Sequence, residues 1–240
     1  MTKKPWMEGP AELLNHGLMH LQQDTDFDNR MAMICIDNSV ELMMKTYLGL
    51  PARITGQKIS KKSYDEFIES FSNLLDAIQQ FANDKLVGIE LGDVEWYHRI
   101  RNQLYHEGNG ITVEKSKVDG YAEIAKILFS NLFSMPQDEF VEIRSDSLVG
   151  EFLSYWVDVE LELKRLAEKY DIKTISMPPT ITTYRRLVAR KIISESLNNQ
   201  FIEARKFRNE LVHGMHNPSS KDLKDHIVVL KTLLQKLREI

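Results

Sequence analysis

The segment FDNRMAMICIDNSVELMMKTYL, residues 27–48, carries the pattern that governs the fold of this chain. Its apolar residues recur at i, i+3, i+4 and i+7, the spacing that places side chains along one face of an α-helix. Gly49 and Pro51 follow the segment and predict the end of that helix. The apolar positions are Met33, Ile36, Val40, Met43, Met44 and Tyr47.

The same helical spacing recurs along most of the chain, and strand-like alternation is limited to a short patch at 140–143. Ser63 stands three residues before Glu66, the spacing of a capping box at a helix start, and Asp93 is expected to cap a later helix. The sequence therefore predicts an all-α protein. Beyond 27–48, helices are expected at 10–22, 63–83, 92–107, 114–133, 147–169, 181–197, 199–213 and 220–239, with a polar loop at 52–62.

The composition is that of an ordinary folded protein with no general affinity for anions. Of 240 residues, 42% are hydrophobic and 28% are charged, and glycine and proline number only 11 and 7. This balance favours a helical globular chain and disfavours disorder. The formal net charge of −4 excludes a basic field over the whole surface, so any site for nucleic acid must be local.

The sequence shows no signal for export or membrane insertion. The first ten residues, MTKKPWMEGP, lack the apolar core of a signal peptide, and no apolar run approaches the roughly 18 residues that span a bilayer. Cys35 is the only cysteine and lies in the apolar run MAMICI, so we expect a buried thiol with no disulfide and no catalytic role. These features predict a cytoplasmic protein without membrane contact.

A six-residue polar pattern occurs twice in the chain. RNQLYH runs from Arg101 to His106 and RNELVH from Arg208 to His213, so both copies read Arg-Asn-x-Leu-x-His. Each copy lies in the next-to-last expected helix of its half of the chain, and a glycine-bearing loop and a long amphipathic helix follow it. This matching order indicates internal duplication. We expect an N-terminal unit at 1–134, a linker at 135–146 and a C-terminal unit at 147–240.

Arginine and histidine together suit chemistry at a phosphodiester. The guanidinium fork matches phosphate oxygens, and imidazole moves a proton near neutral pH. On an ideal helix, however, Arg101 and His106 point about 140° apart, whereas Asn102 and His106 share a face. One copy therefore forms an incomplete site, and two copies brought together would supply an acid, a base and two cations.

These residues resemble the motif of the HEPN superfamily, in which arginine, a polar residue and histidine stand at R-x4-H spacing near the end of a helix. The C-terminal unit resembles the family along nearly its whole length, through WVDVELELKRLAEKY, YRRLVARKIISE and ARKFRNELVHG. The N-terminal unit resembles it from about residue 10 to residue 133, with a longer insert before the motif helix. The resemblance thus covers most of the chain.

The resemblance implies two α-helical units of four or five helices, packed as an intramolecular pseudo-dimer through their motif helices. Many HEPN proteins are metal-independent endoribonucleases of toxin–antitoxin or antiphage (antiviral) defence systems, and they cut RNA by attack of a 2′-hydroxyl on the adjacent phosphate. Others are non-catalytic modules for interaction or dimerisation. By this resemblance the catalytic residues are Arg101, His106, Arg208 and His213, with Asn102 and Asn209 as supporting polar residues.

The implied partners are RNA, a second copy of the chain in a homodimer, and a cognate antitoxin or other partner protein. Basic residues outnumber acidic ones around the second motif, where they could attract RNA locally or form a solvated helix face. Trp96, Tyr97 and Tyr105 near the first motif could stack on unpaired bases or belong to the core. The candidate RNA-binding residues are Arg185, Arg186, Arg190, Lys191, Arg205 and Lys206.

No cofactor and no metal site are expected from the sequence. His16 and His20 stand four residues apart, but no Asp, Glu or Cys completes an obvious ligand set beside them. The chain also lacks a P-loop or GxGxxG pattern, so a nucleotide-binding domain has no direct support. The two main interpretations are an endoribonuclease and a non-catalytic module in which the motif organises an interface.

Overall fold

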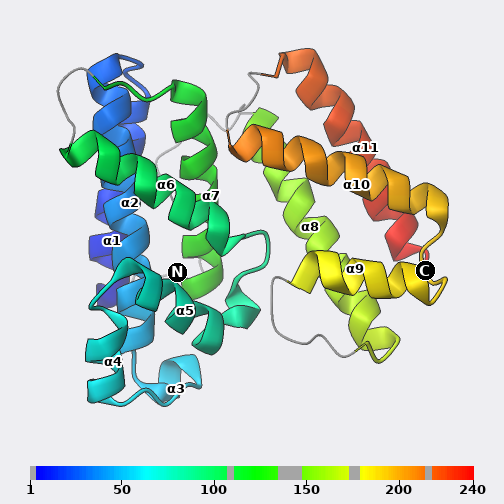
Figure 1. Cartoon of the computed structure of the whole chain (residues 1–240), viewed down its shortest axis with the longest axis horizontal. Helices are drawn as coiled ribbons and strands as arrows, with labels where there is room; N and C mark the ends of the chain where they lie inside the picture. Colours follow the sequence, from blue (N-terminus) through cyan, green and yellow to red (C-terminus); the bar gives the residue numbers. More distant parts are fainter. Residues whose placement is uncertain (1–3, 107–110, 135–147, 173–178, 214–217) are drawn as a thin grey trace. The chain divides into compact units, whose positions relative to one another are not determined.

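The computed structural model describes residues 4–106, 111–134, 148–172, 179–213 and 218–240, apart from a few side chains at the edges of these ranges. Every regular element in these ranges is a helix (Figure 1), so the predicted all-α class is confirmed. None of these helices combines the length and the hydropathy needed to cross a bilayer.

The chain divides into two compact units, Met1–Ile143 and Arg144–Ile240, here called unit 1 and unit 2. The division falls within the predicted linker 135–146, which itself lies outside the described residues. Each unit has its own helices and its own core.

Unit 1 is built around one central helix. Its elements are α1 (Pro5–Leu21), α2 (Asp26–Gly49), α3 (Ala52–Thr55), α4 (Lys61–Phe67), α5 (Phe71–Phe81), the 3-10 helix η1 (Asn83–Lys85), α6 (Leu91–His106) and α7 (Lys115–Phe133). Helix α2 packs along α1 and also contacts α5, α6 and α7 (Figure 1). Its position brings residues of four other helices within reach of its side chains.

The apolar face of α2 is buried as the sequence predicts. Thr25 begins the helix as its N-cap, because its side chain accepts a hydrogen bond from the backbone N–H of Asp28 at 3.1 Å. The predicted stripe of six apolar residues is almost fully removed from solvent. Asp37 is buried on the same helix at 0% exposure, so one carboxylate lies inside an otherwise apolar core.

Two predicted features of unit 1 are wrong in detail. The helix expected at 63–83 is two helices, α4 and α5, and the short α3 lies in the expected loop. Ser60 caps α4 by accepting from the N–H of Ser63, and Ser70 caps α5 by accepting from the N–H of Asn73. The Ser70 side chain accepts from a backbone N–H that would donate to a backbone carbonyl in a continuous helix. This cap explains why the expected helix is interrupted at Ser70.

Asp93 is not the N-cap of α6, because that helix begins at Leu91. The carboxylate instead lies in the first turn and is 3% exposed. Negative charge is favourable at that place, since the first backbone N–H groups of a helix point toward it.

Unit 2 contains α8 (Leu148–Lys169), α9 (Pro179–Ala189), α10 (Glu195–Val212) and α11 (Ser220–Arg238). Helix α8 packs against α9 and α11, and α10 packs against α11. Phe201 of α10 anchors the core, because its ring stacks on Trp156 of α8 at 5.5 Å and on Tyr184 of α9 at 3.9 Å. These contacts fix α10, which carries the second motif.

The helix expected at 181–197 ends earlier, at Ala189. Lys191 adopts a left-handed conformation with φ 58°, which turns the chain out of the helical path. Ser194 then caps α10 by accepting from the N–H of Leu197 at 3.3 Å. The periodic apolar pattern continues across this turn, and for that reason it predicted a helix that is too long.

We expect Gly17→Ala to destabilise unit 1 although alanine favours helices. A Cβ at Gly17 would lie 2.8 Å from Cγ1 of Ile36 and 3.2 Å from the carbonyl oxygen of Ala32 on the neighbouring α2. Such overpacking costs about 1–3 kcal/mol, which exceeds the gain of about 1 kcal/mol in helix propensity. Gly92→Ala is the matched control, since a Cβ there meets no atom of the described residues within 4 Å.

The measurement is urea denaturation with pulsed thiol labelling of Cys35. This residue is the only cysteine, is 8% exposed and reports on unit 1 alone. Burial also raises the pKa of its thiol, so the folded unit resists labelling. Gly17→Ala should shift the labelling transition to lower urea and Gly92→Ala should not; an unchanged Gly17→Ala transition would contradict the packing argument.

Candidate functional site

Both copies of the Arg-Asn-x-Leu-x-His motif lie at the C-terminal end of a helix. In unit 1, α6 ends at His106. In unit 2, α10 ends at Val212 and His213 is its C-cap, with its backbone N–H donating to the carbonyl of Asn209 at 3.0 Å. The predicted position of the motif at the end of the next-to-last helix of each unit is confirmed.

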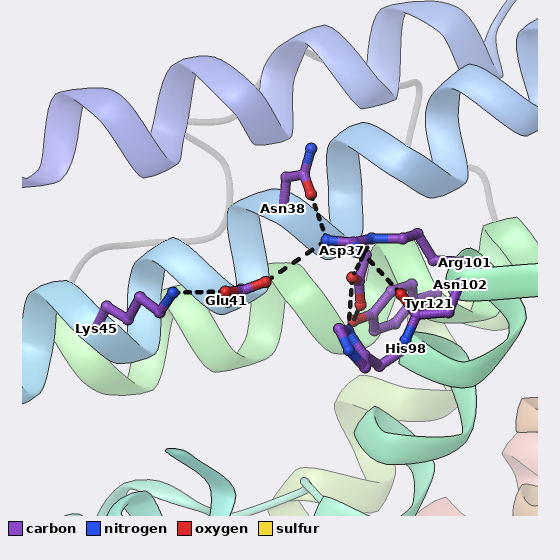
Figure 2. A network of polar contacts seen from close by, with 8 residues as sticks. All are labelled: Asp37, Asn38, Glu41, Lys45, His98, Arg101, Asn102 and Tyr121. Atoms are coloured by element: carbon purple, nitrogen blue, oxygen red, sulfur yellow. Dashed lines mark hydrogen bonds and ion pairs between the residues drawn. The ribbon is translucent and has the colours of Figure 1, made fainter. Parts of the chain in front are cut away.

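The first motif is joined to α2 through the buried carboxylate of Asp37 (Figure 2). Oδ2 of Asp37 lies 2.9 Å from Nδ1 of His98 and 2.9 Å from Nε of Arg101, both on α6. The hydroxyl of Tyr121 on α7 donates to Oδ1 of Asp37 at 2.8 Å. The Asp37 side chain of α2 therefore joins the motif helix α6 to α7 as well as to α2.

The guanidinium of Arg101 makes further contacts around this carboxylate (Figure 2). Its Nη2 donates to Oδ1 of Asn38 at 2.7 Å and lies 3.5 Å from Oε2 of Glu41. Its Nη1 donates to Oδ1 of the next motif residue, Asn102, at 3.0 Å. Lys45 then donates to the other oxygen of Glu41 at 2.6 Å. All three guanidinium nitrogens thus face a partner within unit 1.

The network balances its own charge. Two carboxylates, Asp37 and Glu41, face two cations, Arg101 and Lys45. Pairing of this kind offsets the cost of burying a carboxylate at 0% exposure in a core. Burial, followed by the nearby charge of Asp37, holds the pKa of Tyr121 well above its ordinary value, so its hydroxyl stays protonated and donates.

The face of the His98 imidazole ring packs against an aromatic ring. It stacks on Phe71 of α5 with 3.6 Å between ring centroids and an interplanar angle of 3°. This stacking orients Nδ1 toward Asp37 and adds α5 to the helices that meet at the network. His98 therefore joins α6 to both α2 and α5.

Asp37, Glu41 and His98 also have the donor types of a metal site, with one ligand atom from each lying within 4.8 Å of the others. The two carboxylates, however, are already paired with Arg101 and Lys45. A cation placed here would have to compete with a guanidinium at 2.9 Å for the same oxygen. We interpret the cluster as an internal ion-pair network.

His16 and His20, the histidines weighed from the sequence as metal ligands, lie on α1 and outside this network. Their rings meet edge to face, with 4.8 Å between the centroids of His16 and His20. Nδ1 of His20 lies 2.8 Å from a carboxylate oxygen of Asp28. The spacing of these two residues in the sequence did not predict this contact. The contact fastens the end of α1 to the start of α2.

The second motif repeats one contact of the first but has different surroundings. Nη1 of Arg208 lies 3.5 Å from Oδ1 of Asn209, as Arg101 contacts Asn102 in unit 1. Arg208 is 0% exposed, whereas the side chain of Arg101 is 18% exposed. The preceding residue, Phe207, stacks on His226 of α11 at 3.7 Å. In both units the motif arginine points inward.

Of the two motif histidines, only His213 has its side chain among the described residues. His213 is half-buried at the end of α10. The side chain of His106 lies outside the described residues, as do the glycines Gly108 and Gly214 that follow the two motifs. The described contacts of the candidate site are therefore those of the arginines and asparagines, together with the position of each histidine at a helix end.

The basic residues proposed for RNA binding are spread over α9, the turn after it, and α10. Most of their side chains are exposed, and Lys206 lies 3.7 Å from Glu210. Arg186 and Arg190 come together at a surface hollow of about 460 Å³, where Asp171 also lies. Exposed side chains are Arg185, Arg190, Lys191 and Lys206, and half-buried ones are Arg186 and Arg205.

The aromatic residues near the first motif separate into two kinds. Tyr97 is 0% exposed and stacks on Tyr121 at 4.2 Å, and Trp96 is half-buried against it at 4.8 Å. Tyr105 is 68% exposed. Core packing accounts for Tyr97, whereas Tyr105 faces solvent.

The sequence did not predict that Asp37, Asn38 and Glu41 contact Arg101, although they are most of its partners. A signal for them was present, because these residues with Lys45 interrupt the apolar helix at i, i+1, i+4 and i+8. Such spacing places polar groups along one side of a helix. It does not reveal that this side faces a partly buried arginine from another helix.

We expect Asp37→Asn to lower the free energy of unfolding of unit 1 by about 3 kcal/mol, since it leaves the partly buried Arg101 without its closest carboxylate. Lys45→Ala is the control, because its pair with Glu41 is partly exposed and such pairs contribute about 0–1 kcal/mol. Urea denaturation followed by Cys35 labelling measures both changes. A loss for Asp37→Asn no larger than that for Lys45→Ala would contradict a central role for this carboxylate.

Comparisons with models of protein families, with curated proteins and with solved structures gave no match for this chain. The geometry of the two motif ends and the resemblance of the motifs themselves are therefore the basis for assigning a function.

Proposed function

We propose that this protein is a metal-independent endoribonuclease of the HEPN type, in which each unit contributes one motif to a composite Arg/His site. The observation that carries the proposal is the equivalence of the two motifs: both end the next-to-last helix of a compact unit, and in both the arginine contacts the following asparagine. A short polar pattern that recurs at the same end of a helix, with the same side-chain contact, is more readily explained by a shared function than by chance.

In the proposed reaction the two histidines, His106 and His213, transfer the protons. One takes the proton of a ribose 2′-hydroxyl, whose oxygen attacks the adjacent phosphorus. The bond from phosphorus to the 5′-oxygen breaks, and the other histidine protonates that leaving oxygen. The products are a 2′,3′-cyclic phosphate and a 5′-hydroxyl, and the balance needs no metal or cofactor.

The contacts of Arg101 support a positioning role within this proposal. Its guanidinium nitrogens face Asp37, Asn38, Glu41 and Asn102, so its charge is largely balanced inside unit 1. Fixing Arg101 to α2 holds the end of α6, where the motif histidine stands, and orients the amide of Asn102. Arg208 is fully buried in unit 2.

The basic residues of unit 2 support RNA as the substrate. Four cationic side chains are exposed near the second motif helix or on α10 itself, in a chain whose net charge is −4. Local positive charge is what a polyanion requires from an otherwise acidic protein. They are Arg185, Arg190, Lys191 and Lys206.

The inward position of both arginines favours a second candidate, a non-catalytic interaction module. In this alternative the motif would stabilise each unit and organise an interface, either with a second copy of the chain or with a partner protein such as an antitoxin. A 0% exposed Arg208 suits a structural role as well as it suits catalytic positioning. The two candidates make opposite predictions for RNA cleavage.

His106→Ala and His213→Ala should each reduce RNA cleavage by at least about 100-fold, because loss of a general acid or base typically costs 10²–10⁴-fold. Cleavage by the wild-type chain should persist in EDTA and leave a cyclic phosphate. His16→Ala is the control, since this exposed histidine lies on α1 outside both motifs. The assay uses labelled RNAs of varied sequence, with helical content checked by circular dichroism.

Intact RNA after incubation with pure, folded wild-type protein would contradict the nuclease proposal. If, in addition, the two histidine substitutions lowered the melting temperature sharply, the interaction module would be the better account. Retained folding with lost cleavage supports the nuclease.

A further inference from the structure

Positive charge gathers on one short stretch of unit 1 that the proposed reaction does not use. All the charged residues of 51–64 are basic, and no acidic residue stands between Glu41 and Asp65. The basic side chains are exposed on α3, on α4 and in the turn between them. They are Arg53, Lys58, Lys61 and Lys62, here called the α3–α4 surface.

These cations differ from the others of unit 1 in their partners. In the part of unit 1 that the structure describes, every other lysine and arginine faces a carboxylate or an aromatic ring. Arg53, Lys58 and Lys61 have no partner among the described residues. Lys62 lies 3.9 Å from Glu66, with its side chain 89% exposed. The charge of this surface is therefore not balanced within unit 1.

The turn that carries Lys58 has a defined shape and open space beside it. Gly56 ends α3 with φ 76°, and a Cβ placed on it would meet no described atom within 4 Å. The backbone N–H of Gln57 donates to the hydroxyl of Thr55 at 3.2 Å, which fastens the turn locally. An extended polymer can therefore approach the turn closely.

The α3–α4 surface lies away from the residues that hold the first motif. Arg101 contacts α2 at Asp37, and α2 continues from there to Gly49, about 18 Å along its axis, before α3 begins. Figure 1 shows α3 and α4 beyond that end of α2. An RNA strand covers such a length with about five stacked nucleotides, so one strand is long enough to reach both places.

The chemistry of this surface fits a phosphate backbone better than it fits a protein or a lipid. Protein interfaces have an apolar core, and amphipathic membrane anchors have a broad apolar face. Ile54 is the one exposed large hydrophobic residue here, at 40% exposure. Phosphates require only cations spaced along the strand, and the long side chains of two short helices and a turn supply them.

We propose that the α3–α4 surface binds the phosphate backbone of RNA, as an anchoring site separate from the two motifs. The inference rests on the proposed function in taking RNA as the ligand. It gives unit 1 a part in RNA binding, whereas the candidate RNA-binding residues from the sequence all lie in unit 2. Phosphate contacts do not read bases, so the anchor acts on RNA of any sequence.

The test measures RNA binding in a chain disabled for cleavage by His213→Ala. The probe is a fluorescent RNA of about 20 nucleotides, longer than the span between the surface and the motif. The combined variant should weaken binding at least about 10-fold near 0.1 M salt, and should lower the slope of log affinity against log salt by about 0.7 per cation. It carries Arg53→Gln, Lys58→Gln, Lys61→Gln and Lys62→Gln.

The matched control removes the same charge from exposed lysines of α8 and α11 in unit 2. It should bind RNA within about threefold of the parent chain, because these residues lie outside the proposed anchor. Urea denaturation with Cys35 labelling checks that unit 1 stays folded in both variants, as expected for exposed positions. The control carries Lys164→Gln, Lys221→Gln, Lys224→Gln and Lys236→Gln.

Equal losses in the two variants would overturn the anchor, because they would report net charge alone, and so would folded parent protein that binds no RNA. A larger loss for poly-glutamate, or for vesicles of phosphatidylserine and phosphatidylcholine, than for RNA would assign the surface to a protein or a membrane and overturn the proposal. RNA bound through this surface by a wild-type chain that cuts no RNA would support the anchor and contradict the nuclease, so the two failures are distinguishable.

Discussion

The carboxylate of Asp37 is the interaction on which the motif end of unit 1 depends. It is buried at 0% exposure and is approached by His98, Arg101 and Tyr121 from two other helices. A carboxylate in this place is tolerable only if charge and hydrogen bonds surround it, so its partners are as constrained as it is. The same requirement therefore fixes the position of Arg101, the first residue of the motif on α6.

The two motif helices are both held by contacts with neighbouring helices. In unit 1, Arg101 pairs with carboxylates of α2, and Tyr97 stacks on Tyr121 of α7. In unit 2, Phe201 stacks on rings of α8 and α9, and Phe207 stacks on His226 of α11. The contact between arginine and the next asparagine is common to both. Under the proposed function, this shared contact belongs to the part of each unit that has a task to preserve.

Much of the fold could be predicted from the sequence because helix formation and burial leave a local pattern. The apolar spacing of α2 predicted the core face correctly, from Met33 to Tyr47. The breaks at Ser70 and Lys191 were missed, because a serine cap and one left-handed residue interrupt a helix without interrupting its apolar period. Local pattern therefore predicts which residues are buried more reliably than where a helix ends.

The candidate site could be predicted only in part, for a related physical reason. The motif residues are adjacent in sequence and were found by repetition alone. Their supports are not adjacent: His98 and Asp37 are 61 residues apart, and Tyr121 and Asp37 are 84 apart. Nothing in the spacing of α2 indicates which distant helix its polar side will meet. Contacts of this length depend on tertiary packing, which a single sequence does not encode as a local period.

The difference between the two copies has a consequence for the proposed chemistry. Two identical half-sites would present a symmetric surface, whereas an RNA strand has a direction and needs an acid and a base with distinct tasks. In unit 1 the charge of Arg101 is balanced by carboxylates of α2, whereas unit 2 has exposed cations on α9, on α10 and in the turn between them. Divergence between the copies is therefore compatible with catalysis, and under the proposed function it assigns unequal roles to two motifs of equal sequence pattern.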